Sequence, residues 1–335
     1  MVAASGAPAR ERAVQQPAPE GVDKVFRACN NFIVDDETLS LAKILVDELV
    51  GAFGLPRTPF FRGLFWFLFR RILTRFTALG VTFDRITGDE GLPQGSTWAL
   101  ARFSVQVAAR GGEHIPASGP LLVVANHPGA YDAFAIYSQL VRTDIQWIST
   151  EIPFLDALPH VRPHVIFASR TDARSRISAL RSAIRHLKEG GTLLYFGAGH
   201  RDPDPSVYPG AAEQIDTWLP GIDVFFRHVP GLQMLPTIVS GVVSPRWAHH
   251  PITWLRRKPI DSRRLAEFGQ IISLMLHPER QRMDSHVSFG PPLALAALQE
   301  ESGTKDVLPA VIAREKALLT EHMKWTQALK PTAAP

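Results

Sequence analysis

Apolar residues recur along the chain with two spacings, and these spacings predict where helices and strands lie. Residues 38–53 carry leucine and isoleucine three and four positions apart, which predicts an amphipathic helix. Pro56 and Pro59 end it, and an aromatic-rich helical segment follows over residues 59–79. Residues 308–329 show the helical spacing again. Both ends of the folded chain are therefore expected to be helical.

Short apolar runs in the middle of the chain predict buried strands. A helical pattern over residues 176–188 lies between two of these runs, and this alternation is typical of an α/β sheet. We predict a mixed, partly parallel sheet flanked by helices, with an N-terminal helical arm. The expected strands are residues 121–125, 165–168, 192–196, 235–243 and 286–289.

The same pattern divides the chain into four parts. Residues 1–22 are rich in Ala, Pro and charge and are predicted to be a disordered leader without a secretory signal. Residues 23–95 are predicted to form a helical arm that docks on a membrane, and residues 96–300 the α/β domain. Residues 301–335 are expected to contribute a helix that packs on that domain. No apolar stretch reaches the ~20 residues needed to span a bilayer, so the chain is expected at a membrane surface.

Composition narrows the function classes. A hydrophobic content of 45% and a charged content of 20% exclude wholesale disorder. The single cysteine, Cys29, excludes an internal disulfide and a cysteine-rich metal site and indicates a reducing compartment, the cytoplasm. His249 and His250 lack a third ligand at usable spacing, so no metal is expected. No nucleic-acid motif accompanies the net charge of +4, and nucleic acid is not an expected partner.

The most informative stretch is residues 121–134, where a buried strand runs into Asn126 and His127. A Pro-Gly turn follows, and Asp132 begins an apolar helix. Reactive groups in α/β sheets gather where strands end, and the turn can bring the Asp132 carboxylate to the imidazole. A carboxylate bonded to one ring nitrogen fixes the tautomer and raises the basicity of the other nitrogen. In the alternative interpretation, Asp132 is a helix N-cap and His127 is structural.

This Asn-His-x-x-x-x-Asp pattern resembles the first signature of the glycerolipid acyltransferases, typified by lysophosphatidic acid acyltransferase. Residues 112–120 resemble the lead-in to that family's first strand. Three further stretches resemble its second, third and fourth blocks in the same order: residues 165–170, 193–201 and 234–239.

The resemblance implies that His127 is a general base oriented by Asp132. The base would deprotonate an acceptor hydroxyl for attack on the thioester of acyl-CoA or acyl-carrier protein, with no covalent acyl-enzyme and no cofactor. The acceptor would be a lysophospholipid or another lipid. The residues implied in substrate binding are Asn126, Arg170, Gly199, His200 and Arg201, with the two arginines on an acceptor phosphate or another anion.

The third block departs from the family pattern. Gly197 stands where proline is usual, Ala198 where glutamate is usual and His200 where threonine is usual. The missing glutamate puts glycerol phosphate in doubt as the acceptor, and the proline-rich acidic segment 202–205 is predicted to reshape the acceptor pocket. Two alternatives stay open: a noncatalytic lipid-binding homologue, and a thioesterase-like hydrolase in which His127 activates water.

Two surfaces carry further expectations. Arginines and a lysine share one face of residues 174–188 and form either a platform for CoA phosphates or an acidic carrier protein, or simply a solvated face. Residues 59–69 are rich in aromatic side chains with basic flanks, which fits insertion at an anionic bilayer surface. The alternatives for this segment are a core helix or a dimer contact. The predicted membrane-docking residues are Phe60, Phe61, Phe65, Trp66, Arg70 and Arg71.

Overall fold

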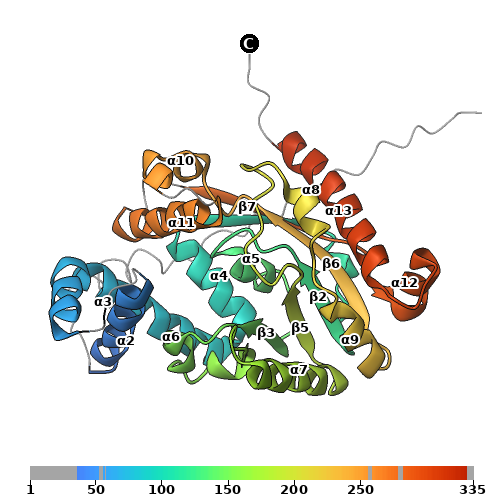
Figure 1. Cartoon of the computed structure of the whole chain (residues 1–335), viewed down its shortest axis with the longest axis horizontal. Coiled ribbons are helices and arrows are strands. Elements are labelled where there is room, and N and C mark those ends of the chain that lie inside the picture. The colour runs from blue at the N-terminus through green and yellow to red at the C-terminus, as the bar shows by residue number, and fades with distance from the viewer. Residues whose placement is uncertain (1–35, 53–55, 57, 256–258, 278–281, 330–335) are drawn as a thin grey trace, which may run out of the picture.

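The computed structural model describes residues 36–52, 56, 58–255, 259–277 and 282–329. The predicted leader, residues 1–22, and Cys29 lie outside these ranges. Within them an eight-stranded sheet crosses the molecule in the order β1-β7-β6-β2-β5-β3-β4, with β8 beside β6 (Figure 1). The strands are β1 (Val105–Arg110), β2 (Leu121–Ala125), β3 (Ile145–Ser149), β4 (Val165–Phe167), β5 (Thr192–Phe196), β6 (Gln233–Ser240), β7 (Met283–Phe289) and β8 (Leu293–Ala294).

The sheet is mixed but mostly parallel. Strands β6, β2, β5, β3 and β4 run parallel to one another, and β1 runs parallel to β7. Only the pairings of β6 with β7 and with β8 are antiparallel among the described strands. The predicted fold class, a partly parallel sheet flanked by helices with a helical N-terminal region, is confirmed.

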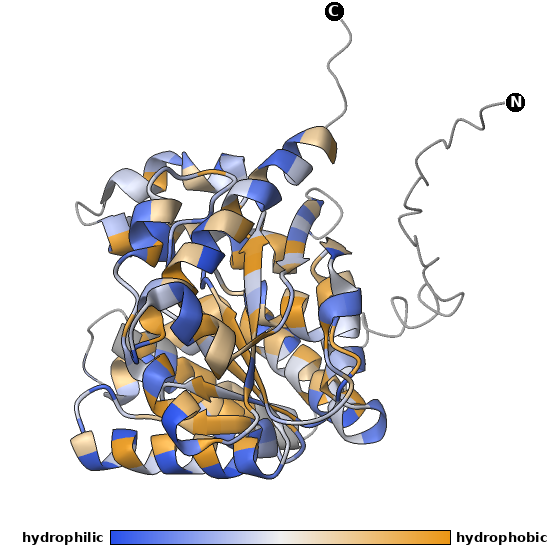
Figure 2. Ribbon diagram, turned by 90° about the vertical axis from the view of Figure 1, so that its right-hand side faces the viewer, coloured by the Kyte–Doolittle hydropathy of each residue, from blue (hydrophilic) through white to orange (hydrophobic). Residues whose placement is uncertain are grey.

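Helices cover both faces of the sheet (Figures 1 and 2). Alternation along β2 sends Leu121, Val123 and Ala125 into one apolar layer and Leu122 and Val124 into the other. The helices are α2 (Asp36–Ala52), α3 (Pro59–Glu90), α4 (Leu92–Arg102), α5 (Asp132–Tyr137), α6 (Pro153–Asp156), α7 (Ala173–Lys188), α8 (Ala211–Ile215), α9 (Gly221–His228), α10 (Pro245–Ala248), α11 (Pro259–Leu276), α12 (Leu295–Ser302) and α13 (Leu308–Leu329). Short 3₁₀ helices are η1 (Gly112–His114), η2 (Arg162–His164) and η3 (Pro251–Leu255).

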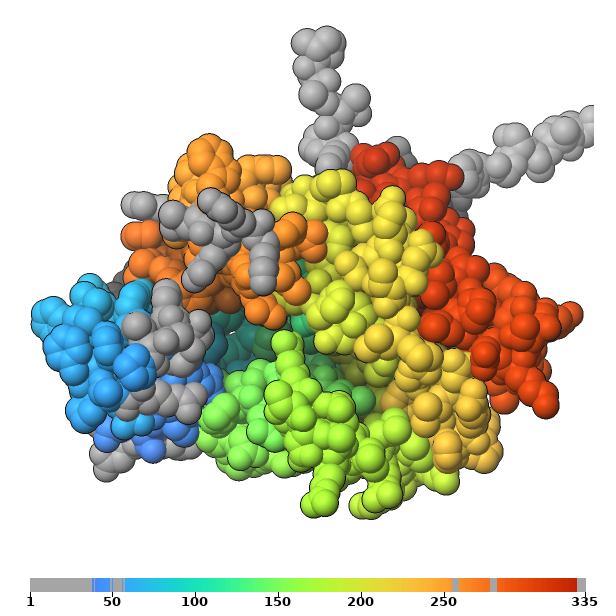
Figure 3. Space-filling view, viewed as in Figure 1, coloured from blue at the N-terminus to red at the C-terminus, as the bar shows by residue number. Residues whose placement is uncertain are grey.

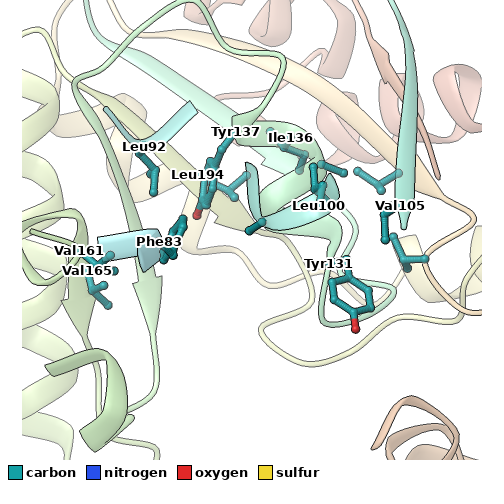
Figure 4. Close-up of a cluster of buried hydrophobic side chains, with 14 of the residues drawn as sticks. Phe83, Leu92, Leu100, Val105, Tyr131, Ile136, Tyr137, Val161, Val165 and Leu194 are labelled. Atoms are coloured by element: carbon teal, nitrogen blue, oxygen red, sulfur yellow. The ribbon is translucent and has the colours of Figure 1, made fainter. Parts of the chain in front are cut away.

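The two layers draw on different parts of the chain. Helices α2 to α5 pack on the first layer, whereas α7, α9, α12 and α13 pack on the second. Figure 4 shows Phe83 of α3 and Leu92 and Leu100 of α4 beside Ile136 and Tyr137 of α5. The end of α3 and all of α4 therefore belong to the core that supports α5.

Helix α3 is longer than the predicted segment 59–79. Gly80 lies where that prediction stops the helix, yet a side-chain carbon there would come within 2.4 Å of the Phe154 ring. The glycine permits close packing against α6 and does not end the helix. Beyond it, the Asp84 carboxylate accepts the backbone N–H groups of His160 and Val161 at 2.9 and 2.8 Å. The division between arm and domain at residue 95 stays a prediction.

Candidate active site

The sequence blocks meet at one edge of the sheet because the strands that precede them are parallel. Strands β2, β4, β5 and β6 all end at this edge, and their loops carry His127, Arg170, Arg201 and the segment 241–244. In the view of Figure 3, the surface is hollowed between the orange helices α10 and α11 and the green helices α6 and α7. The floor of this hollow has the teal colour of the chain around α4.

His127 and Asp132 are in contact. The imidazole Nδ1 lies 2.7 Å from Asp132 Oδ2, and the carboxylate also accepts the backbone N–H groups of Gly129 at 3.1 Å and Ala133 at 2.6 Å. A carboxylate accepts hydrogen bonds, so a neutral imidazole that donates its Nδ1–H to Asp132 presents the lone pair of Nε2. Asp132 is buried, whereas the His127 side chain is 26% exposed. Tyr131 occupies the N-cap position of α5, so the alternative in which Asp132 caps this helix is wrong.

Three neighbours fix the position of His127. The ring of Phe196, at the end of β5, stacks on the imidazole with centroids 4.2 Å apart. Asp202 bonds to both backbone groups of His127: its carboxylate accepts the N–H at 2.8 Å and its own N–H donates to the carbonyl at 2.9 Å. Asn126 donates to the carbonyl of Val239 at 2.9 Å and accepts its N–H at 2.8 Å. Because Asn126 is buried and joins β2 to β6, the prediction that it binds substrate is wrong.

The acidic segment 202–205 serves the backbone. Asp204 is fully buried, and its carboxylate accepts the backbone N–H groups of Ser206, Gly241, Val242 and Val243. Burial raises the pKa of Asp204, and it raises the pKa of Asp202 to about 6. The two carboxylates thus hold His127 and the loop after β6, and neither is open to substrate. The prediction that this segment reshapes the acceptor pocket is corrected to this anchoring role.

The unusual third block has a packing explanation. A side-chain carbon at Gly197 would come within 2.2 Å of the Trp218 indole, so proline cannot occupy this position. Ala198 is buried in the second apolar layer, where a glutamate side chain would lack polar partners. Gly199 has a φ of +65°, which favours glycine. His200 is exposed next to it.

The side chain of Arg201 already has a charged partner. It forms an ion pair with Glu267 of α11, and this carboxylate is buried. Burial lowers the pKa of Arg201, the cations of Arg264 and Arg170 lower it further, and Asp132 raises it. These charges are therefore close enough to influence one another. Arg170 is exposed, and its carbonyl accepts a bond from Arg176 at 2.8 Å.

Sequence reasoning missed Asp202 as a partner of His127 and missed Glu267 altogether. The Asp-Pro-Asp-Pro stretch was visible, but its spacing does not reveal which backbone groups it meets. Glu267 lies in α11, a helix that the sequence patterns did not predict, and no local motif surrounds it. Among the described residues, no group of three or more His, Cys, Asp or Glu side chains is placed to hold a metal ion.

Comparisons with known proteins bear on this site. Residues 106–216 match a family model described as Acyltransferase, a range that includes His127, Asp132, Arg170 and the third block. Among solved structures, the chain is similar to the crystal structure of the 1-acyl-sn-glycerophosphate (LPA) acyltransferase, PlsC, from Thermotoga maritima. That match has 17% sequence identity and a TM-score of 0.41 and covers 91% of this chain and 99% of the other. No curated protein matches the chain.

Proposed function

We propose that the protein, whose residues 106–216 match the Acyltransferase family model, transfers a fatty acyl group from a thioester to a lipid hydroxyl. The donor is acyl-CoA or acyl-carrier protein, and the acceptor is a lysophospholipid-like or other lipid. The observation that carries the proposal is the 2.7 Å contact between His127 and the buried Asp132, made while the imidazole stays partly exposed.

The reaction needs one base and no nucleophile from the chain. Nε2 of His127 takes the proton of the acceptor hydroxyl, and the oxygen attacks the thioester carbonyl carbon. The tetrahedral intermediate collapses with loss of the thiolate, which takes the proton back from the imidazolium. Asp132 stabilises that imidazolium and keeps Nδ1 protonated throughout. The products are an ester and a free thiol.

Basic side chains at the active edge suit the anionic parts of the substrates. Arg170 is exposed after β4, and Arg174 is exposed in the first turn of α7, whereas Arg181 and Arg185 lie toward the far end of that helix, which packs where β5 begins. We assign Arg170 and Arg174 to the phosphates of CoA or to the acidic surface of a carrier protein. Gly199, with no side chain, permits a substrate to approach the backbone closely.

Helix α3 provides the surface that we assign to membrane docking. Phe60 and Phe67 are each 71% exposed, and Leu64 and Leu68 are exposed beside them at helical spacing. The predicted Arg70 and Arg71 are also exposed and suit anionic headgroups. Among the described residues, no helix is long and apolar enough to cross a bilayer. Docking would place the protein peripherally, at the membrane surface that supplies its lipid acceptor.

Three of the predicted docking residues are buried or partly buried in the structure. Phe65 is only 7% exposed and packs in the first apolar layer, so the prediction that it contacts the membrane is wrong. Phe61 and Trp66 are partly buried against the same layer. The docking face is therefore the one that carries Phe60, Leu64, Phe67 and Leu68.

Vesicle flotation tests the docking face. The double variant Phe60→Ser/Phe67→Ser should bind anionic vesicles at least about tenfold more weakly, since burying each ring in lipid contributes roughly 1.5–3 kcal/mol. Val141→Ser/Ile177→Ser removes two exposed apolar side chains elsewhere and is the matched control. Equal binding of both double variants would disprove docking through α3.

Thiol release tests the activity. The protein is incubated with acyl-CoA or acyl-carrier protein, with and without lysophospholipid extract, and the released thiol and the acylated lipid are measured. Release that depends on the acceptor supports acyl transfer. Release that ignores the acceptor would identify a thioesterase, and no release with either donor would identify a noncatalytic lipid-binding protein.

A further inference from the structure

Helix α11 brings a second set of polar side chains to the active edge of the sheet. The helix is fixed there by Gln270, which donates to the carbonyl of Val242 at 2.8 Å and accepts the N–H of Ser244 at 2.8 Å. Glu267 lies one turn before Gln270 on the same helix. Because the segment 242–244 follows β6, α11 is tied directly to the loops that surround His127.

Glu267 is placed at the turn that carries the dyad. A side-chain carbon at Gly129, between His127 and Asp132, would lie 3.1 Å from Glu267 Oε1. The carboxylate is buried and forms an ion pair with Arg201. It therefore contributes a negative charge to the pocket in which Arg201, Asp132 and Arg170 already influence one another.

This arrangement changes what the pocket can bind. Ala198, three residues before Arg201, faces an apolar layer and supplies no charge, and the carboxylate beside Arg201 comes from α11. A phosphate monoester, which carries nearly two charges, would compete with Glu267 for the guanidinium of Arg201, and any weakening of that pair costs free energy because the carboxylate is buried. Removing one partner of a buried ion pair is strongly unfavourable. The added dianion would also repel Glu267 and Asp132.

We propose that Glu267 is a specificity-determining residue that withholds Arg201 from anionic headgroups, so that the acceptor is a lipid hydroxyl whose headgroup carries at most one negative charge. This inference rests on the proposed acyl transfer for the identity of the ligand as an acceptor. The electrostatic part concerns the pocket alone and is tested without an acyl donor.

The test is direct calorimetric binding of two probes to the full chain. Glycerol 3-phosphate supplies a phosphate monoester, and glycerophosphocholine supplies a phosphodiester. Glu267→Gln should lower the Kd for glycerol 3-phosphate about tenfold or more, because the freed guanidinium makes a charge-assisted bond to the probe. The Kd for glycerophosphocholine should change less than about threefold, because its phosphodiester carries only one negative charge and the choline cation offsets it. Adding Arg201→Gln to that variant should abolish the gain.

Two controls keep the outcome decisive. Glu301→Gln removes a carboxylate from an exposed Glu–Arg pair, with Arg314 at 2.6 Å, and should leave both affinities unchanged. The double variant Glu267→Gln/Arg201→Gln removes both charges together and leaves no buried carboxylate unpaired, so it should bind glycerol 3-phosphate as the wild type does, and it decides the matter if Glu267→Gln does not fold. Unchanged or weaker phosphate binding in Glu267→Gln overturns the proposal, as does a tenfold loss in the double variant. A gain in Glu267→Gln in a protein that shows no thiol release would support the assignment of Glu267 and refute acyl transfer.

Discussion

Two histidines beside the described sheet lie in clusters of polar side chains, His127 with Asp132 and His322 with Ser240 and Ser288, and only the first cluster is open. At the active edge, His127 has one ring nitrogen bonded to Asp132 and its other nitrogen available. Under α13, His322 has both nitrogens bonded, to Ser240 Oγ at 2.7 Å and to Ser288 Oγ at 2.8 Å. Glu315 lies fully buried on the same helix. A histidine near a strand end is therefore a candidate base only where one of its ring nitrogens is unbonded and its ring is partly exposed.

The environments also set opposite electrostatic conditions. Burial, with His286 and Arg110 nearby, lowers the pKa of His322 to about 3, so its imidazole is neutral at pH 7. Burial raises the pKa of Glu315 well above its ordinary value. His322 under α13 is thus a neutral ring that joins the helix to β6 and β7 through two serine hydroxyls. The active edge, in contrast, holds the Arg201–Glu267 ion pair.

Replacing each histidine gives the largest expected contrast. His127→Ala should lower acceptor-dependent turnover by ~10²–10⁴, the usual contribution of a general base. His322→Ala should leave turnover per folded molecule unchanged and should instead lower the free energy of unfolding, because two buried serine hydroxyls lose their partner. Turnover and chemical denaturation are measured on the same preparations. Equal losses of turnover in the two variants would contradict the assignment of a catalytic role to His127 alone.

Much of this contrast was accessible from the sequence. His127 and Asp132 are five residues apart after a short apolar run, so a turn between strand and helix brings them together, and the strand, turn and helix are all visible locally. Strands β2 and β5 and helix α13 have their predicted bounds, because their apolar residues follow one regular spacing.

The remaining features depend on contacts between distant segments. Asp202 meets His127 across 75 positions, and His322 meets Ser240 across 82. Strand β3 was missed because most of its residues are only partly buried, so it shows no continuous apolar run. Helix α11 was missed as well, and with it Glu267. The apolar pattern of a segment indicates which of its own side chains are buried, but it does not show which polar group of a distant segment will contact them.

The stability of the α13 cluster should depend on pH. The folded-state pKa of His322, about 3, lies below the ordinary 6.5, so between these values the unfolded chain binds the extra proton. Its contribution is present above pH 6.5 and is lost as pH falls, by roughly 3–5 kcal/mol at pH 3. Urea denaturation from pH 7 to 3 should show this loss in the wild type but not in His322→Gln. His228→Gln, an exposed histidine on α9, should follow the wild type; parallel curves for His322→Gln and wild type would contradict the assignment.

Asp202 at the active edge should show the opposite slope, with a smaller size. Its folded-state pKa of about 6 lies above the ordinary 3.8, so the folded protein binds the extra proton between these values. Stability from this group is therefore present at low pH and is lost, by on the order of 2–3 kcal/mol, as pH rises from 4 to 7. Asp202→Asn keeps an oxygen that can accept the His127 N–H and removes the charge. The free energy of unfolding of this variant, relative to that of the wild type, should therefore increase as pH rises from 4 to 7. Asp89→Asn, at an exposed position, should show no such increase. An increase of equal size in Asp89→Asn would show that net charge, and not the burial of Asp202 beside His127, determines how stability depends on pH.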